Sequence, residues 1–367
     1  MKSLYYNQLI NFGGDPEFSF SLNGKSIGSE KVIPLNGIDC GMLQGNGPRS
    51  KIIIDGYQAE LNITPASCRA YFGNNIASCF RTLARNINQN NVNVNFASVV
   101  KIPREELKSL SEKSKIFGCN PSNNAYNEIE TKITVNPKKY LKRSCGGHIH
   151  ISDNQNETVR AILKNPKKIV PVLDAIVGNL SVLLDRNPAN IERRKYYGRA
   201  GEYRQPIWGL EYRTLSNFWL QSYQLMSLML GMVRFSVLAV EQLDEEFITA
   251  ISKEVPREKI IRAIQENNFD LAYENYSKLE PIILELTSNV YYYDHFPIHN
   301  YHIKEFRYFI EKGINYWFRD DPFKHWLNLS DGHGIGFESF LIDVVRKDMN
   351  NQQKIPTIQK TFKEIWV

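Results

Sequence analysis

The chain lacks the cysteine spacings and charge clusters that identify several classes of protein. Its 367 residues include five cysteines, an odd number, and none of them stand in a CxxC pair, so neither a zinc knuckle nor a disulfide framework is indicated. The formal net charge is +6, but no block of lysine and arginine accompanies it, and we expect no specific nucleic-acid partner. The mild positive excess is compatible with an anionic ligand.

Targeting and membrane signals are also missing. The first 14 residues contain no apolar core of the signal-peptide type. The longest apolar stretch, residues 225–240, is shorter than the ~20 residues that a membrane helix needs, and it contains Arg234. We therefore expect a buried core helix at this position, no membrane partner, and a cytoplasmic protein.

The sequence has ample apolar material for a large core. Hydrophobic residues make up 42% of the chain and aromatic residues 12%, which predicts a folded protein. Strand-like runs lie at residues 32–35, 51–54 and 92–100, and helix-like runs at 66–90, 164–185, 216–246, 257–268 and 337–349. Because the strands are short and joined by hairpin-length turns, we predict an α+β fold with a mainly antiparallel sheet and helices on its back.

The triplet Glu-Tyr-Arg occurs twice within residues 194–220, once as Glu202–Arg204 and again from Glu211 to Arg213. Side chains two residues apart on a strand point to the same face, so each triplet sets a carboxylate beside a guanidinium. A carboxylate suits a hard cation, and the planar arginine suits phosphate oxygens. An exposed strand with ordinary ion pairs, worth only ~0–1 kcal/mol each, would show the same pattern.

A period-two pattern of ligand-type side chains recurs at three other places. Asp15 and Glu17 flank Pro16, Gln58 alternates with Glu60 and Asn62, and His148 alternates with His150. An ordinary solvent face would mix lysine, threonine and serine with glutamate, whereas these faces carry the residue types that bind metals. Carboxylates gathered on one face repel unless cations lie among them. We infer a metal-binding face of the sheet.

These motifs stand in a recognisable order, namely DPE, QAELN, GCNPSNNAY, GGHIHI, NIERRKYYGRAGEYR and GLEYRTLSNFWL. The order resembles that of the phage-type COOH-NH2 ligases, or amidoligases, which are relatives of glutamate-cysteine ligase and glutamine synthetase. The resemblance implies a curved antiparallel sheet that forms an ATP-binding funnel. We expect residues 1–220 to form this catalytic region, and residues 221–367 to form a mainly helical region packed on it as part of one domain.

The resemblance also implies roles for individual residues. Acidic residues on the first strands would hold divalent ions between the ATP phosphates and the substrate carboxylate, here Glu17 and Glu60, with Asp15 as a further candidate. One of the two histidines, His148 or His150, would be adjacent to the metal, and His150 is also a candidate for the nucleotide site.

At the Glu-Tyr-Arg triplets, the resemblance makes Glu211 the last metal carboxylate and Arg213 the phosphate-binding arginine. The first triplet offers Glu202 and Arg204 as alternatives for the same two roles. Arg194 and Arg199, which precede the triplets, are candidates for guiding nucleotide phosphates. Basic residues that complement a helix dipole would give the same pattern as these two arginines.

The implied activity is an ATP- and Mg²⁺-dependent carboxylate-amine ligase, with Mn²⁺ as an alternative cation. A carboxylate would attack the γ-phosphate of ATP, and an amine would displace phosphate from the acyl phosphate to give an amide. Arg213, Arg204 and Glu60 are the residues expected to act in catalysis: the arginines and bound Mg²⁺ would neutralise charge on the transferring phosphoryl group, and Glu60 would hold the ion. The substrates would be small-molecule, peptide or protein carboxylates and amines.

The same resemblance implies a location and an assembly. If a phage encodes the chain, the expected location is the cytoplasm of the host cell. Relatives of this fold often form rings or dimers, so a homo-oligomer is compatible with it.

Two other functions fit part of the pattern. A His-x-His strand with acidic partners also holds zinc in metal-dependent hydrolases, which need no ATP. A non-catalytic structural or assembly protein would keep a ligase-like fold with a dead site. The paired arginines argue against a hydrolase. The presence of the carboxylates and of both histidines argues against a non-catalytic protein.

Overall fold

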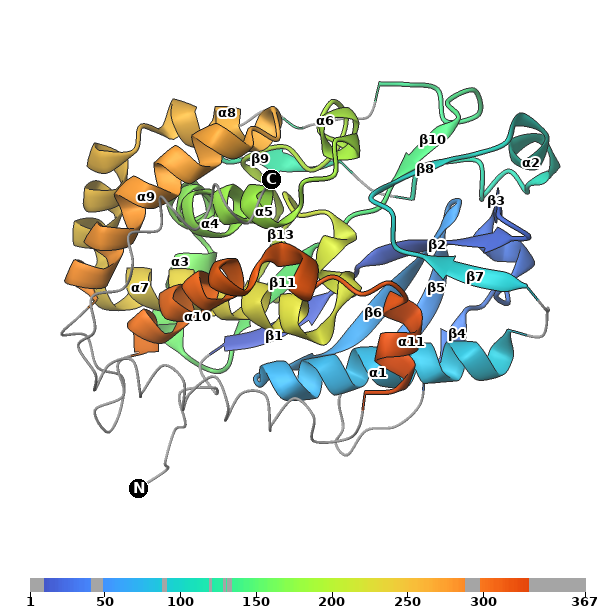
Figure 1. Ribbon diagram of the computed structural model, residues 1–367, viewed down its shortest axis with the longest axis horizontal. Coiled ribbons are helices and arrows are strands. Elements are labelled where there is room, and N and C mark those ends of the chain that lie inside the picture. The colour runs from blue at the N-terminus through green and yellow to red at the C-terminus, as the bar shows by residue number, and fades with distance from the viewer. Residues whose placement is uncertain are drawn as a thin grey trace.

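The computed structural model describes residues 10–40, 49–87, 91–118, 121–127, 130, 134–287 and 298–329. The centre of this described part is an eleven-stranded sheet in which β3, β2, β6, β1, β11, β13, β12 and β9 follow one another, β4 and β5 continue from β6, and β7 pairs with β2 (Figure 1). The strands are β1 (Ile10–Gly14), β2 (Glu17–Leu22), β3 (Lys25–Ile27), β4 (Ile38–Asp39), β5 (Lys51–Asp55), β6 (Gln58–Ala66), β7 (Val92–Asn95), β9 (Asn123–Asn124), β11 (Ile149–Asp153), β12 (Glu202–Arg204) and β13 (Leu210–Tyr212). A separate pair is formed by β8 (Val99–Lys101) and β10 (Lys142–Ser144).

The helices are α1 (Arg69–Asn86), α2 (Arg104–Ser109), α3 (Glu157–Leu163), α4 (Pro166–Leu173), α5 (Asn179–Leu184), α6 (Ala189–Arg193), α7 (Tyr223–Glu254), α8 (Arg257–Gln265), α9 (Phe269–Leu286), α10 (Ile298–Lys312) and α11 (Pro322–Leu327). Shorter helical turns are η2 (Ser29–Lys31), the π-helical turn η3 (Asp174–Gly178), η4 (Asn217–Gln221) and η5 (Ile314–Tyr316). Helix α1 packs on β1, β5 and β6, α3 on β11, and α4 on β12 and β13. All the described pairings are antiparallel, so the predicted α+β fold is confirmed.

Alternation along the strands gives the sheet two different faces. On the helix side, Phe18, Ala59, Ile149 and Leu210 are buried in the hydrophobic core. Because successive side chains of a strand point to opposite faces, their polar neighbours face away from the helices. These neighbours are Glu17, Glu60, His150 and Glu211. The period-two pattern therefore places its ligand-type residues on one face.

Helix α7 crosses the helical layer and packs on α1, α3, α4, α9 and α10. It is long and apolar enough to cross a membrane, but its most apolar stretch is completely buried inside the protein. The helix extends beyond the apolar run of residues 225–240 at both ends. It bends at Asp244, where φ is 44°. The expected core helix over residues 225–240 is confirmed.

Some predicted elements differ from the structure. Residues 32–35 form no strand, because the N–H groups of Val32 and Ile33 both donate to the Ser29 carbonyl and continue η2 into a turn. The run at 92–100 is divided between β7 and β8, which belong to different sheets. Helix α1 begins at Arg69 because β6 continues through Ala66. The predicted helix at 337–349 lies outside the described residues.

Candidate functional site

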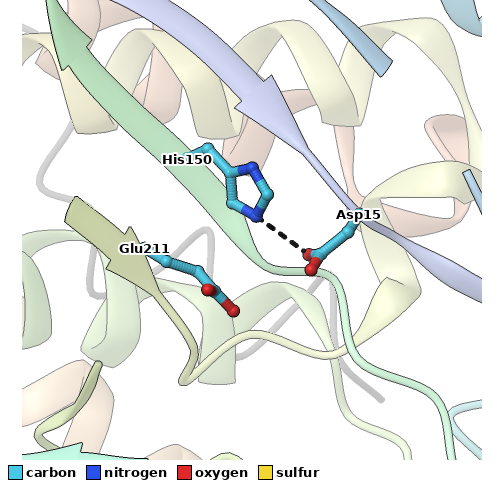
Figure 2. Close-up of side chains that lie close together, drawn as sticks. All are labelled: Asp15, His150 and Glu211. Atoms are coloured by element: carbon cyan, nitrogen blue, oxygen red, sulfur yellow. Dashed lines mark ion pairs between the residues drawn. The ribbon is translucent and has the colours of Figure 1, made fainter. Parts of the chain in front are cut away.

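Two groups of three ligand-bearing side chains lie on the sheet face opposite the helices. One consists of Asp15, His150 and Glu211, and the other of Glu17, Asp55 and Glu60. Within each group the ligand atoms lie within 4.8 Å of one another. Figure 2 shows the first group, whose side chains come from the end of β1, from β11 and from β13 and converge on one space.

Strand register brings the first group together. His150 stands opposite Gly13 of β1 on one side and opposite Glu211 of β13 on the other. Asp15 lies in the break between β1 and β2, and its Oδ1 atom is 3.3 Å from Nε2 of His150. A side chain at Gly13 would meet the Cβ atom of His150 at 3.2 Å, so glycine here leaves room for the imidazole.

The second group lies one strand further along the sheet. Glu17 of β2 stands opposite Glu60 of β6. Asp55 comes from the end of β5, where a two-residue hairpin turn leads into β6 and sets Asp55 opposite Gln58. The Gln58 amide donates to Oε2 of Glu17 at 3.2 Å, and the backbone N–H of Gly146 donates to the same oxygen at 2.7 Å. These two donors fix the orientation of the Glu17 carboxylate.

A buried chain of contacts joins the two groups. Nδ1 of His148 lies 2.9 Å from Oδ1 of Asp15, and its Nε2 atom contacts the Tyr197 hydroxyl. The Tyr197 hydroxyl also donates to Oε1 of Glu17 at 3.2 Å. Because both ring nitrogens of His148 are engaged, this histidine links the groups, whereas His150 belongs to the first group itself.

Burial and mutual repulsion shift the pKa values of most of these carboxylates upward. Burial and the charge of Asp55 raise the pKa of Glu17 to about 8, and burial and the charge of Asp15 raise the pKa of Asp55 to about 6. Burial, followed by the charge of Asp15, raises the pKa of Glu60 well above its usual range and that of Glu211 to about 8. The ionised forms therefore need compensating positive charge.

Asp15 differs from the other acids because two histidines face it. Burial opposes its ionisation, but the charges of His148 and His150 in their protonated forms, together with their hydrogen bonds, outweigh burial and hold the pKa of Asp15 well below the usual range. Burial and the neighbouring Arg213 lower the pKa of His148 to about 4, so this imidazole is neutral at pH 7. Burial would lower the pKa of His150 as well, but the Asp15 carboxylate outweighs it and raises that pKa.

Two arginines border the first group at Glu211. Arg204 stands opposite Glu211 in the β12–β13 pairing, with Nη2 at 3.3 Å from Oε1 of Glu211, and Arg213 contacts the same oxygen. Arg213 is fully buried, and its guanidinium lies 5.3 Å from the centre of the Tyr197 ring. The arginines of both Glu-Tyr-Arg triplets thus share one carboxylate.

Three other predicted residues point elsewhere. Oε2 of Glu202 accepts the backbone N–H of Gly198 at 2.9 Å, and Glu202 is in neither ligand group. Arg194 donates to Oδ1 of Asn267 at 2.7 Å, and Arg199 donates from Nε to the Arg194 carbonyl at 3.2 Å. Their roles at a metal or nucleotide site stay predictions, and in the structure these contacts hold neighbouring parts of the chain together.

A buried carboxylate on the helix side supports β13. Asp174, in the π-helical turn η3, accepts hydrogen bonds from Tyr212 (2.6 Å), Tyr126 (2.9 Å), Thr214 (3.2 Å) and the N–H of Gly201 (2.6 Å). Burial raises its pKa to about 6, against the effect of these donors. Because Tyr212 stands between Glu211 and Arg213 and points to the opposite face, this anchor fixes the position of both site residues.

The site contains two residues that the sequence did not reveal. Asp55 precedes a glycine, and the Asp-Gly pair is typical of a hairpin turn, so its turn chemistry concealed its place beside Glu60. No sequence pattern indicated a role for Tyr197, because its contacts with Glu17 and His148 join segments that are far apart in the chain.

Comparison with known proteins adds one match. A family model described as phage phiEco32-like COOH.NH2 ligase-type 2 matches residues 122–327, which is more than half of the chain. The matched part includes β11, β12 and β13, and it also contains His148, His150, Glu211 and Arg213. No curated protein matches the chain.

Proposed function

The chain belongs to the phage phiEco32-like COOH-NH2 ligase type 2 family, a family of carboxylate-amine ligases, and from this premise we propose that it is an ATP- and Mg²⁺-dependent ligase. In the proposed reaction a carboxylate is activated as an acyl phosphate and then joined to an amine. The family supports the ligase reaction, and the geometry of the site supports the requirement for nucleotide and metal.

The observation that carries the proposal is the pair of acidic groups on one sheet face with two arginines at its edge. Five of the six ligands in the two groups are carboxylates, which suits Mg²⁺ better than a soft metal. Burial and the neighbouring carboxylates raise the pKa values of Glu17 and Glu60, so a bound cation would stabilise their ionised forms. The residues present therefore fit bound divalent cations, and Mn²⁺, which accepts imidazole as well as carboxylate, fits the first group too.

When bound, Mg²⁺ would neutralise charge on the phosphates and leave the γ-phosphate open to attack. Asp15, His150 and Glu211 would hold one ion, and Glu17, Asp55 and Glu60 another. Arg213 and Arg204 would donate to phosphate oxygens beside Glu211. Asp174 would keep β13 in place behind them, because its four donors hold Tyr212 and the segments around it.

The proposed reaction has two steps, phosphoryl transfer and then amide formation. An oxygen of the substrate carboxylate attacks the γ-phosphorus of ATP, and the bond to the β,γ-bridging oxygen breaks, so ADP leaves. The nitrogen of the amine then attacks the acyl carbon, phosphate leaves with the electrons of its C–O bond, and the nitrogen loses a proton. The fixed arginines, and the cations that the buried carboxylates would hold, would supply electrostatic stabilisation without reorganisation during phosphoryl transfer.

The geometry of the histidines favours the ligase over a zinc hydrolase. A His-x-His zinc site needs two imidazole nitrogens directed at one ion. Here His148 engages Asp15 and Tyr197, and only His150 belongs to a ligand group. The intact acidic groups likewise support an active enzyme over a non-catalytic assembly protein.

The proposal is tested by ADP release from Mg²⁺-ATP in the presence of mixed amino acids, peptides and amines. Glu60→Gln should abolish turnover and Arg213→Lys should lower it by about a hundredfold or more, while circular dichroism shows an unchanged fold. Glu258→Gln, at a glutamate whose side chain is 77% exposed on α8, is the matched control and should retain full turnover. Retained turnover in both site variants would refute the assignment.

A further inference from the structure

A cavity opens to solvent beside the second acidic group, and its roughly 410 Å³ includes part of that open solvent. Glu17, Asp55 and Gln58 lie at one end of it, and four aromatic residues line it, namely Phe117, Tyr140, Tyr196 and Tyr197. We propose that this cavity binds the amine substrate as its ammonium ion, with the charged nitrogen directed toward Glu17 and Asp55. This inference rests on the proposed function and assigns the second substrate to a place.

The aromatic residues form a continuous wall. The ring centres of Phe117 and Tyr140 are 6.4 Å apart, and those of Tyr140 and Tyr196 are 5.7 Å apart. Aromatic faces carry partial negative charge and attract ammonium groups, most strongly where water is excluded. The Arg143 guanidinium already lies 4.7 Å from the centre of the Phe117 ring, so the Tyr140 and Tyr196 rings beside the carboxylates are the part of the wall that suits an alkylammonium ion.

Charge balance favours a cation in the cavity even when a metal is bound. The second group contains three carboxylates, Glu17, Asp55 and Glu60, with a total charge of −3 when all are ionised. One divalent ion contributes +2, so a charge of −1 remains, and Glu17 and Asp55 are the members that line the cavity. An ammonium ion would neutralise this remaining charge.

The walls of the cavity are held by a buried arginine. Arg143 donates from Nη1 to the carbonyls of Tyr140 (2.8 Å) and Lys142 (2.9 Å), and from Nη2 to those of Lys115 and Pro137 (both 2.9 Å). These bonds tie together the two segments that carry Phe117 and Tyr140. The cavity is therefore a built feature of the fold.

Two details define the ends of the cavity. Gly118 lies directly against the Asp55 carboxylate. A Cβ atom at position 118 would be 1.3 Å from Oδ1 of Asp55, so only glycine lets the backbone come this close to the carboxylate. Lys142 supplies a cation to the lining, but its Nζ atom lies 3.2 Å from Oε1 of Glu192, which also accepts the Tyr140 hydroxyl at 2.9 Å. Glu192 also pairs with Nζ of Lys195 at 2.9 Å, so Lys142 shares this carboxylate, and the preference of the cavity for a cation rests on Glu17 and Asp55.

Aromatic rings can also stack on the adenine base of ATP. A neutral base gains nothing from the charge of Glu17 and Asp55, whereas an ammonium ion gains both cation–π and charge attraction. The two occupants are distinguished by which affinity falls when a ring is removed.

The test uses ligand-observed saturation-transfer NMR on the full chain with propylammonium as the probe and 1-propanol as its neutral counterpart. Both are measured with Mg²⁺ and a non-hydrolysable ATP analogue present, and the affinity for the analogue is measured separately by calorimetry. Tyr196→Leu removes a ring and keeps an apolar side chain, and Asp55→Asn removes a charge. Tyr71→Leu, at a tyrosine that is 61% exposed on α1, is the control.

We expect propylammonium to bind, propanol to bind much more weakly, and Tyr196→Leu and Asp55→Asn each to weaken propylammonium by about tenfold or more. The affinity of Tyr196→Leu for the ATP analogue should stay within about twofold of wild type, since the proposal assigns this ring to the amine and not to the nucleotide. Weakened analogue binding in Tyr196→Leu, or equal binding of propanol and propylammonium, would overturn the amine site. So would absence of propylammonium binding to a protein that binds the analogue, whereas absence of analogue binding would count against the proposed function instead.

Discussion

Replacing Glu60 with glutamine should stabilise the protein when divalent cations are absent and remove its stabilisation by Mg²⁺. Glu60 is one of three carboxylates whose ligand atoms lie within 4.8 Å of one another. Without a cation these groups repel, so glutamine, which keeps the size of the side chain and removes its charge, relieves the repulsion. With a cation the same replacement removes a ligand.

The expected gain follows from the separation of the charges. Two unit charges 4.8 Å apart repel by about 3 kcal/mol at an effective dielectric constant of about 20. The group takes up protons instead of carrying all three charges, so we expect about 1–3 kcal/mol at pH 8. For a chain of 367 residues, whose unfolding entropy is about 0.8 kcal/mol/K, this corresponds to a Tm higher by about 1–4 °C.

The pH dependence has a defined sign. Burial and the charge of Asp55 raise the pKa of Glu17 from 4.5 to about 8, so between these values the folded protein binds more protons than the unfolded chain. Stability without metal therefore falls as pH rises from about 4.5 to about 8. Glu60→Gln should make this fall shallower, because it removes one of the charges that raise the pKa of its neighbours.

Thermal unfolding in EDTA and in Mg²⁺, at pH 5.5 and pH 8, measures these effects. Wild type should gain about 3 kcal/mol from Mg²⁺ at one hundred times its dissociation constant, and Glu60→Gln should gain much less. Glu258→Gln, at an exposed glutamate, should follow wild type in every condition. If Glu60→Gln were less stable than wild type in EDTA at pH 8 and had the same slope with pH, the three carboxylates would not be repelling one another.

Further predictions concern the anchor behind β13, the phosphate-binding arginine and the aromatic ring over His150. Asp174→Asn sets an amide NH2 against two of the four donors and should cost about 2–4 kcal/mol in urea unfolding. Because burial raises the pKa of Asp174 from 3.8 to about 6, its contribution to stability falls as pH rises between those values, and the variant should lose that slope. Arg213→Lys cannot form a bidentate contact with phosphate and should lower ATP turnover by about a hundredfold or more, with Km for ATP measured alongside. Trp208 lies with its ring centre 4.9 Å from that of His150, so Mn²⁺ should quench its fluorescence and Mg²⁺ should reverse the quenching; equal quenching in Trp208→Phe would contradict a metal ion at His150.

Local patterns were sufficient for much of the fold. Residues 51–54 are a strand and residues 225–240 are a core helix, because alternation and helical spacing are properties of neighbouring residues. The prediction of a strand at residues 32–35 was wrong. There the hydrogen bonds to the Ser29 carbonyl close a turn, and this turn overrides the strand propensity of the residues. The division of residues 92–100 between two sheets depends on distant partners that no local pattern reveals.

The candidate site shows the same division. The carboxylate-bearing strands were visible from the types and spacing of their side chains. Which copy of Glu-Tyr-Arg joins a ligand group depends on register, because Glu211 stands opposite His150 while Glu202 stands opposite Asn124. The roles of Asp55 and Tyr197 depend on contacts across the sheet, so they became visible only in three dimensions.

Calorimetric titration of the full chain with a non-hydrolysable ATP analogue, in Mg²⁺ and again in EDTA, tests the central claim most directly. It needs no knowledge of the acid or the amine. We predict binding in Mg²⁺ that disappears in EDTA and in Glu60→Gln, and that persists in Glu258→Gln. Binding of equal strength in EDTA, or no binding under either condition, would contradict a metal-dependent nucleotide site on this face of the sheet.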